Sequence, residues 1–143
     1  MGEYAVKEGN HVIATMGVGS CVAVSIIDNN HELAGLAHVM LPKKEGDKSE
    51  KRADVLINNL MEEIQEKESL VDLEAKIFGG AQMIKDSQHV GDKNLESVRE
   101  ILKEKDIPIT AEDVEGDKGR AVWLHTRSGE AVVRKAFGET KSY

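Results

Sequence analysis

The segment spanning residues 15–27 constrains the fold of this chain most, because it joins a glycine turn, the single cysteine and a continuous apolar run. Gly17 and Gly19 predict a sharp turn or a close approach to another part of the backbone, since glycine adopts positive φ without steric cost. Residues 22–27 are apolar or small at nearly every position, which is typical of a strand covered on both faces. We therefore expect a central strand, with Cys21 where a loop enters it.

The next segment, Asp-Asn-Asn-His at residues 28–31, predicts a tight hairpin, because asparagine tolerates the left-handed conformations that such turns require. The returning strand is expected over residues 32–41, before a proline that cannot donate to a sheet ladder. If the two asparagines form a two-residue turn, Cys21 lies directly opposite His38. Opposed Cβ atoms are about 4.5–5.5 Å apart, which lets an imidazole accept the proton of a thiol.

A longer turn would shift this register, and both residues also have a simpler interpretation. A free cysteine is often only a small buried hydrophobe, and a lone histidine on an apolar strand is often a core residue with its polar atoms satisfied. From the residues alone, a catalytic Cys21–His38 pair and a structural pair both remain open.

Length and composition favour one globular domain over residues 1–143, with 40% hydrophobic and 31% charged residues. No apolar run approaches the length of a membrane span, and the N-terminal residues lack the pattern of a signal peptide. We therefore expect a cytoplasmic protein. A single cysteine excludes an intramolecular disulfide and a multi-cysteine zinc site.

A formal net charge of −7 disfavours binding to nucleic acid or to anionic membranes. The basic groupings at residues 43–44 and 48–52 are interrupted or flanked by acidic residues, as expected of a solvated segment. We therefore predict neither a nucleic-acid partner nor membrane insertion.

The remaining pattern alternates short strands with two amphipathic helices. Ser49 is a candidate N-cap for the first helix, and Gly91-Asp92 for the opening of the second. Residues 43–48 are expected to form a mobile loop, and the polar tail after Phe137 is expected to fray. The predicted helices span residues 50–67 and 93–105, and the further strands span residues 3–6, 11–14, 73–78, 107–114, 121–126 and 130–135. This order predicts an α/β or α+β fold, with a mostly antiparallel sheet system and two helices packed against it.

Several segments together form a recognisable pattern that spans nearly the whole chain. A Gly-x-Gly-Ser-Cys segment ending at Cys21 is followed at a fixed distance by Ala-His-x-Met-Leu-Pro around His38. The further segments are Glu3-Tyr-Ala-Val6, Ala53-Asp54, Ala75-Lys-Ile-Phe-Gly-Gly-Ala81 and Ala111-Glu-Asp113. With these segments the chain resembles the CheD chemoreceptor glutamine deamidases.

The resemblance implies a cysteine hydrolase that converts selected glutamines on the cytoplasmic helices of chemoreceptors to glutamate. It assigns the nucleophile to Cys21, the base to His38 and an orienting role to Thr15, on a fold shared with some deamidating toxins. It also implies a protein partner, the CheC phosphatase. No metal and no organic cofactor are required.

The residue types agree with this chemistry. A thiol with a pKa near 8.5 becomes a good nucleophile at neutral pH only when a neighbouring base takes its proton. Backbone N–H groups around Ser20 and Cys21 are candidates to hold the oxyanion, and Gly19 belongs to the same substrate-binding segment. The adjacent glycines Gly79 and Gly80 permit close approach of another backbone, either a substrate groove or a tight turn.

Two other classes of function remain open. The chain is alternatively a regulatory binding module that engages CheC, with weak or absent deamidation. A thiol-based redox sensor is the third hypothesis, but such sensors usually need a resolving cysteine, and the chain has only one cysteine.

Overall fold

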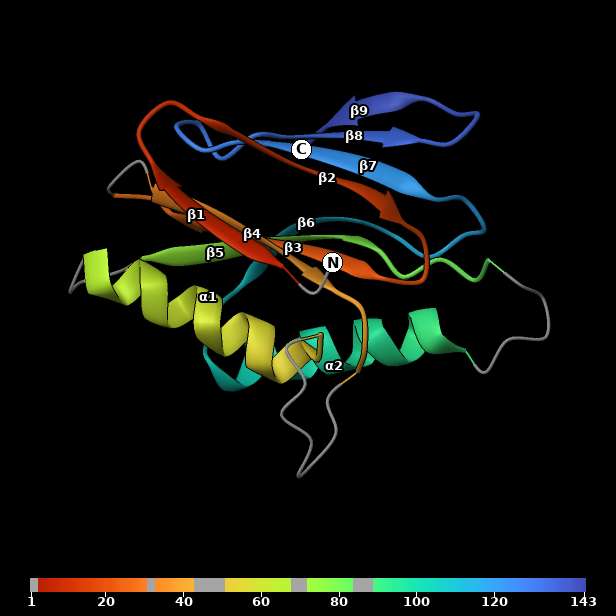
Figure 1. The fold of residues 1–143 in the computed structure, drawn as a ribbon, viewed down its shortest axis with the longest axis horizontal. Coiled ribbons are helices and arrows are strands. Elements are labelled where there is room, and N and C mark those ends of the chain that lie inside the picture. Colours follow the sequence, from red (N-terminus) through yellow and green to blue (C-terminus); the bar gives the residue numbers. More distant parts are fainter. Residues whose placement is uncertain (1–2, 31–32, 43–50, 68–71, 84–88) are drawn as a thin grey trace.

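The fold is seen in a computed structural model that describes residues 3–30, 33–42, 51–67, 72–83 and 89–143. In these ranges the chain forms three layers (Figure 1). A five-stranded sheet in the order β1-β4-β3-β5-β6 lies between the two helices and a four-stranded sheet in the order β2-β7-β8-β9. All strand pairs are antiparallel except β5 with β6. The predicted fold class, mostly antiparallel with two packed helices, is confirmed.

All the predicted strands and helices are present with shifted ends, and one further strand follows them. The strands are β1 Tyr4–Glu8, β2 Val12–Val18, β3 Val22–Asp28, β4 Leu33–Val39, β5 Leu73–Gly79, β6 Ile109–Val114, β7 Arg120–His125, β8 Ala131–Lys135 and β9 Thr140–Ser142, and the helices are α1 Ala53–Lys67 and α2 Val90–Glu104.

Strand β3 is the centre of the molecule, as its continuous apolar run predicts. Every residue of β3 and of its neighbour β4 is buried. Val22, Val24 and Ile26 pack in the core beneath the helices, whereas Ala23 and Ile27 pack in a second core between the two sheets. A strand covered by helices on one face and by a sheet on the other has no polar side, which explains the absence of alternation.

The hairpin of β3 and β4 forms, but the predicted register is wrong by two residues. Asp28 pairs with Leu33, and His38 pairs with Ala23 rather than with Cys21. The connection is therefore four residues long, residues 29–32, of which the last two lie outside the described part. The Asp28 carboxylate accepts a hydrogen bond of 3.0 Å from the backbone N–H of Asn30, an Asx turn that opens the connection beyond two residues.

Helix α1 begins later than the pattern predicts. The backbone N–H groups of Met40 and Leu41 both donate to the carbonyl of Lys51, and Leu41 forms a bridge with Arg52. This pairing keeps residues 51–52 out of the helix, which starts at Ala53. The predicted N-cap Ser49 and the predicted loop at residues 43–48 lie outside the described residues.

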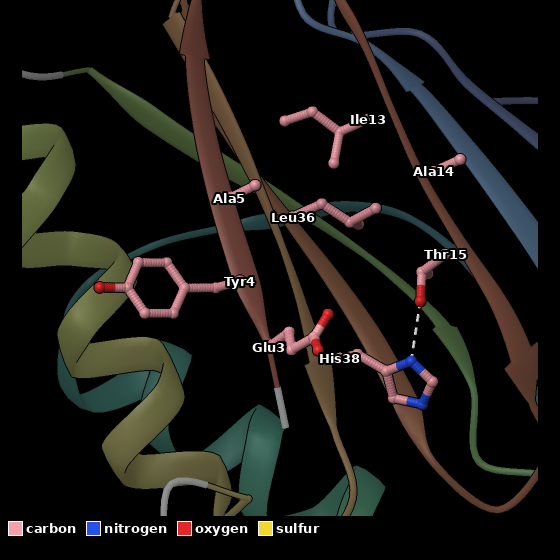
Figure 2. Close-up of a pocket in the computed structure, with 8 residues that line it drawn as sticks. All are labelled: Glu3, Tyr4, Ala5, Ile13, Ala14, Thr15, Leu36 and His38. Atoms are coloured by element: carbon pink, nitrogen blue, oxygen red, sulfur yellow. Dashed lines mark hydrogen bonds between the residues drawn. The ribbon is translucent and has the colours of Figure 1, made fainter. Parts of the chain in front are cut away.

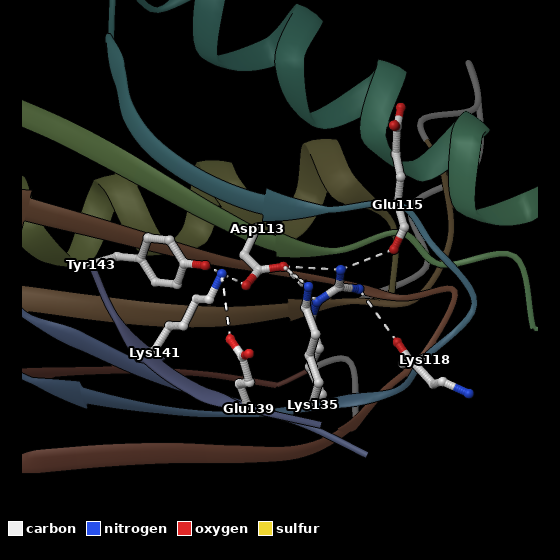
Figure 3. A network of polar contacts seen from close by, with 8 residues as sticks. Asp113, Glu115, Lys118, Lys135, Glu139, Lys141 and Tyr143 are labelled. Carbon is white, nitrogen blue, oxygen red and sulfur yellow. Dashed lines mark hydrogen bonds and ion pairs between the residues drawn. The ribbon is translucent and has the colours of Figure 1, made fainter. Parts of the chain in front are cut away.

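The prediction that the tail frays is wrong. Residues 140–142 form β9 against β8, and the backbone of Tyr143 exchanges two hydrogen bonds with Ala131. The Tyr143 ring packs on Phe78 with centroids 5.7 Å apart, and its hydroxyl donates to Asp113 (Figure 3). A strand of three exposed polar residues shows no alternation of apolar and polar residues that would predict it. Only the aromatic residue that follows it, Tyr143, indicated an ordered end of the chain.

A buried charge cluster joins this tail to β6 and β7. Arg120 lies 3.0 Å and Lys135 3.2 Å from the same oxygen of the Asp113 carboxylate. Burial alone would raise the pKa of Asp113, but hydrogen bonds from Tyr143 and Lys135 and the charge of Arg120 hold that pKa below its usual value. Burial and the neighbouring carboxylate raise the pKa of Tyr143 to about 12. The cluster is therefore ionised and paired near neutral pH, with Tyr143 as a donor.

Neither of the helices in the described residues is long and apolar enough to cross a membrane.

Candidate active site

The chain passes from one sheet to the other immediately before Cys21. Strand β2 belongs to the four-stranded sheet and β3 to the five-stranded sheet, so residues 19–21 form the crossing. The pairing of β2 with β7 shifts by one residue between Thr15 and Val18, which marks a β-bulge, and Gly17 within it has a φ of 66°. Bulges bend a strand and re-aim its side chains. After the bulge the pairing resumes at Val18, the last residue of β2, three residues before Cys21.

Thr15 and His38 meet across the two sheets. The Thr15 Oγ1 and the His38 Nδ1 share a hydrogen bond of 2.8 Å (Figure 2). His38 is buried on β4, and its backbone N–H donates to the carbonyl of Glu3. The ring is therefore oriented by a partner that comes from the opposite layer. The contact agrees with the orienting role that the resemblance assigns to Thr15.

Cys21 shares the space between the sheets with His38. The residue opposite His38 is Ala23, and Cys21 lies two residues before Ala23, so Cys21 and His38 are diagonal neighbours on one face of the sheet. Cys21 also packs against the core between the sheets. Diagonal neighbours are about 7–8 Å apart, still within reach of a ring side chain. The two-residue error in register therefore kept the pair on a common face, because side-chain direction repeats every two residues.

The pKa values of Cys21 and His38 are both shifted so as to favour the uncharged forms. Burial raises the pKa of the Cys21 thiol, opposed in part by a hydrogen bond from its own backbone N–H. Burial also lowers the pKa of the His38 imidazole. At neutral pH the arrangement therefore contains a thiol and a neutral imidazole rather than a thiolate–imidazolium ion pair.

The glycine pair at the end of β5, Gly79 and Gly80, supports the backbone of Cys21 from the side of helix α2. The N–H of Gly80 donates to the Cys21 carbonyl at 2.7 Å. A Cβ atom on Gly79 would lie 2.4 Å from that carbonyl oxygen, and one on Gly80 would lie 2.4 Å from Leu95. Both glycines are buried and have positive φ. The predicted close approach of another backbone is therefore found at Gly79, which lies against the Cys21 carbonyl.

The two residues before Cys21 are held by their main-chain groups. Gly19 donates its N–H to the Gly17 carbonyl, and its own carbonyl accepts from Ala81. The Ser20 carbonyl accepts a hydrogen bond of 2.9 Å from the side chain of Asn94. The sequence interpretation missed Asn94, although a polar residue within the apolar period of α2 was a usable signal.

A small cavity of about 100 Å³ lies beside the Thr15–His38 pair. Figure 2 shows its lining, which consists of Glu3, Tyr4, Ala5, Ile13, Ala14, Thr15, Leu36 and His38. Cys21 does not line it, so the proposed nucleophile lies outside this cavity. Among the described residues, no cluster of three histidine, cysteine or acidic side chains is arranged to hold a metal ion.

Comparison with known proteins identifies the family of this chain. Residues 40–135 match the family model described as CheD chemotactic sensory transduction. The chain is 42% identical to the chemoreceptor glutamine deamidase CheD of Thermotoga maritima, over 96% of this chain and 90% of that protein. The chain belongs to the CheD family.

Two archaeal CheD proteins extend the comparison. The chain is 39% identical to the probable chemoreceptor glutamine deamidase CheD of Archaeoglobus fulgidus, over 96% of this chain and 92% of that protein. It is 37% identical to the protein of the same description from Haloarcula marismortui, over 94% of this chain and 82% of that protein. The names of these CheD relatives agree with the enzyme class predicted from the sequence, a hydrolase of carboxamide C–N bonds.

Proposed function

We propose that this CheD-family protein deamidates selected glutamine side chains on the cytoplasmic helices of chemoreceptors, releasing ammonia and leaving glutamate. The names of its relatives supply the substrate class. The observation that carries the mechanism is the 2.8 Å hydrogen bond between Thr15 and His38, on the face of the sheet that Cys21 shares. Such a protein acts in the cytoplasm, where the receptor helices lie.

The first half of the reaction forms a thioester. The His38 Nε2 accepts the thiol proton while the Cys21 sulfur attacks the glutamine carboxamide carbon. The Nδ1–H then donates to Thr15 Oγ1, because an imidazole that accepts at Nε2 carries its proton at Nδ1. The carbonyl oxygen becomes an oxyanion, for which the Cys21 N–H is the proposed donor. Protonated His38 gives its proton to the leaving nitrogen, the C–N bond breaks, and ammonia departs.

The second half hydrolyses the thioester. A water molecule loses a proton to His38, its oxygen attacks the thioester carbon, and the sulfur leaves to recover the proton as a thiol. The product is a glutamate side chain. Neutral starting groups suit this sequence, because a neutral imidazole is ready to accept a proton at the moment of attack.

The test uses a chemoreceptor cytoplasmic fragment as substrate. Deamidation raises the mass of the fragment by about one dalton per site, since an NH₂ group is replaced by OH, and it releases one ammonia per site. Both quantities are measured with and without CheC. Ammonia release by this protein alone supports the enzyme, whereas CheC binding without any mass change would support the regulatory binding module.

Two replacements of Thr15 distinguish the contribution of its hydroxyl to activity from that of its branched shape. Thr15→Val keeps the branched shape and removes the hydroxyl, and we expect kcat to fall by about 10- to 100-fold, since a neutral hydroxyl orients the imidazole without adding charge. Thr15→Ser keeps the hydroxyl and should remain within a few-fold of the wild type. Steady-state deamidation kinetics measure both. Wild-type turnover in Thr15→Val would reduce the site to a Cys21–His38 dyad.

A further inference from the structure

Helix α2 carries a buried polar side chain at a position where its period calls for an apolar one. Asn94 is fully buried, at 0% exposure, between Gly91 and Leu95 on the inner face of the helix. A primary amide buried there loses its bonds to water and must recover them from the protein. The residue is therefore expected to hold specific partners.

Its partners are the two segments that carry the proposed nucleophile and base. The Asn94 Nδ2 donates to the Ser20 carbonyl at 2.9 Å and to the Met40 carbonyl at 3.3 Å. Carbonyl oxygens only accept, so the NH₂ side of the amide must be the side that faces them. Ser20 precedes Cys21 directly, and Met40 follows His38 by two residues. One side chain thus ties both segments to the helix.

The bond to Ser20 fixes the direction of the next N–H. The Ser20 C=O and the Cys21 N–H belong to one planar trans peptide, so they point in opposite directions. Pinning the carbonyl toward α2 aims the Cys21 N–H away from α2, toward the space between the sheets. Cys21 itself packs against the core between the sheets. The donor and the nucleophile therefore face the same side.

The helix is placed for this task by close backbone packing. A Cβ atom on Gly91 would lie 2.6 Å from the carbonyl oxygens of both Gly80 and Ala81, so only glycine lets α2 approach this turn. The same turn bonds to the Cys21 carbonyl through the Gly80 N–H. The peptides on both sides of Cys21 are therefore held from the α2 side, the preceding one by Asn94.

The Asn94 Oδ1 is buried and has no hydrogen-bond partner among the described residues. A side chain kept only for stability is expected to have all its polar atoms paired, since an unpaired buried acceptor destabilises the fold. Residues that break such a rule occur mainly at functional sites. We propose that Asn94 is a positioning residue. It holds the Ser20–Cys21 peptide so that the Cys21 N–H can donate a hydrogen bond to the oxyanion that forms on the substrate. The inference rests on the proposed deamidation.

Asn94→Ala tests this role with Val98→Ala as the matched control. Val98 lies one turn further along the same buried face, so its truncation loosens α2 without touching Ser20. We expect Asn94→Ala to lower kcat by about 10- to 100-fold, somewhat less than deletion of an oxyanion donor, and to leave KM within about threefold. Val98→Ala should keep kcat within about threefold at a comparable loss in Tm.

Alkylation of Cys21 by iodoacetamide provides the second readout. Displacement of iodide by sulfur forms no oxyanion, so the alkylation rate and its pH profile should be the same in Asn94→Ala and in the wild type. A parallel loss of alkylation and turnover, or an equal loss of kcat in Val98→Ala, would mean that Asn94 only stabilises the fold. If the wild type itself releases no ammonia, the proposed function fails instead.

Asn94→Asp is the second variant, since it keeps the shape of the side chain and removes the NH₂ group that faces the two carbonyls. If neither variant folds, the wild type is examined by NMR with a peptide aldehyde that replaces the glutamine carboxamide and forms a hemithioacetal with Cys21. We expect a coupling across the hydrogen bond from the Asn94 NH₂ to the Ser20 carbonyl, and a downfield shift of the Cys21 amide proton. Absence of either signal overturns the proposal.

Discussion

Replacement of Cys21 by serine is expected to abolish deamidation of a receptor fragment, with a fall in turnover of about 10⁴-fold or more. The chain contains one cysteine, so no other thiol can take over the attack. A serine hydroxyl keeps nearly the same size but has a far higher pKa. Burial lowers the pKa of His38, which makes the imidazole a still weaker base for such a hydroxyl. Ammonia release and intact mass of the fragment measure the loss.

The fold should survive this change, because the segment is held by main-chain bonds rather than by the sulfur. The Cys21 carbonyl accepts from Gly80, and the Gly19 carbonyl accepts from Ala81. Thermal unfolding of Cys21→Ser should therefore stay within a few degrees of the wild type. Ser25→Ala on β3, the strand that follows Cys21, is the matched control and should remain active. Substantial activity in Cys21→Ser would show that the protein is not a cysteine hydrolase.

The central part of the fold could be predicted from the sequence, because the patterns that determine it there are local. An unbroken apolar run predicts a strand buried on both faces, and β3 is covered by helices and by the second sheet as expected. The hairpin followed from the asparagines, but the turn length depends on how the Asp28 side chain caps Asn30, which a propensity does not specify. The resulting error of two residues is the smallest that keeps every side chain on its face.

The division into two sheets had no comparable signal. Strand β2 pairs with β7, more than one hundred residues away in the chain, and this pairing brings Thr15 over His38. Only the resemblance predicted that Thr15 and His38 act together. Short polar segments also lack a sequence signal, and the three-residue strand β9 is an example. It is followed by Tyr143, whose hydroxyl donates to Asp113.

Asn94 was not predicted as a site residue for a different reason. The helix was predicted from its apolar residues, and a buried polar residue among them was passed over as part of the pattern. Its partners are carbonyls of Ser20 and Met40, which no periodicity can name. A polar residue at an apolar position of a helix is therefore worth treating as a candidate positioning residue before the structure is known.

His38→Ala is the second variant expected to remove most of the activity, with kcat lower by about 10²- to 10⁴-fold, the usual contribution of a general base. The structural reason for this loss is that the Cys21 thiol and the His38 imidazole are both neutral before the reaction. Burial raises the pKa of Cys21, so little thiolate exists at neutral pH unless the imidazole accepts the proton during attack. His11→Ala is the matched control, because the His11 side chain is exposed and lies outside the site. It should keep wild-type turnover.

The pH profile distinguishes a base from a structural residue. Only the neutral imidazole accepts a proton, so kcat/KM of the wild type should rise with pH through the pKa of His38 and then level off. Because burial lowers that pKa, the rise should lie below the ordinary value for histidine, about 6.5. In His38→Ala this rise should vanish, and the residual activity should instead increase toward alkaline pH, where Cys21 ionises. An unchanged acidic limb in His38→Ala would assign the proton transfer to another group.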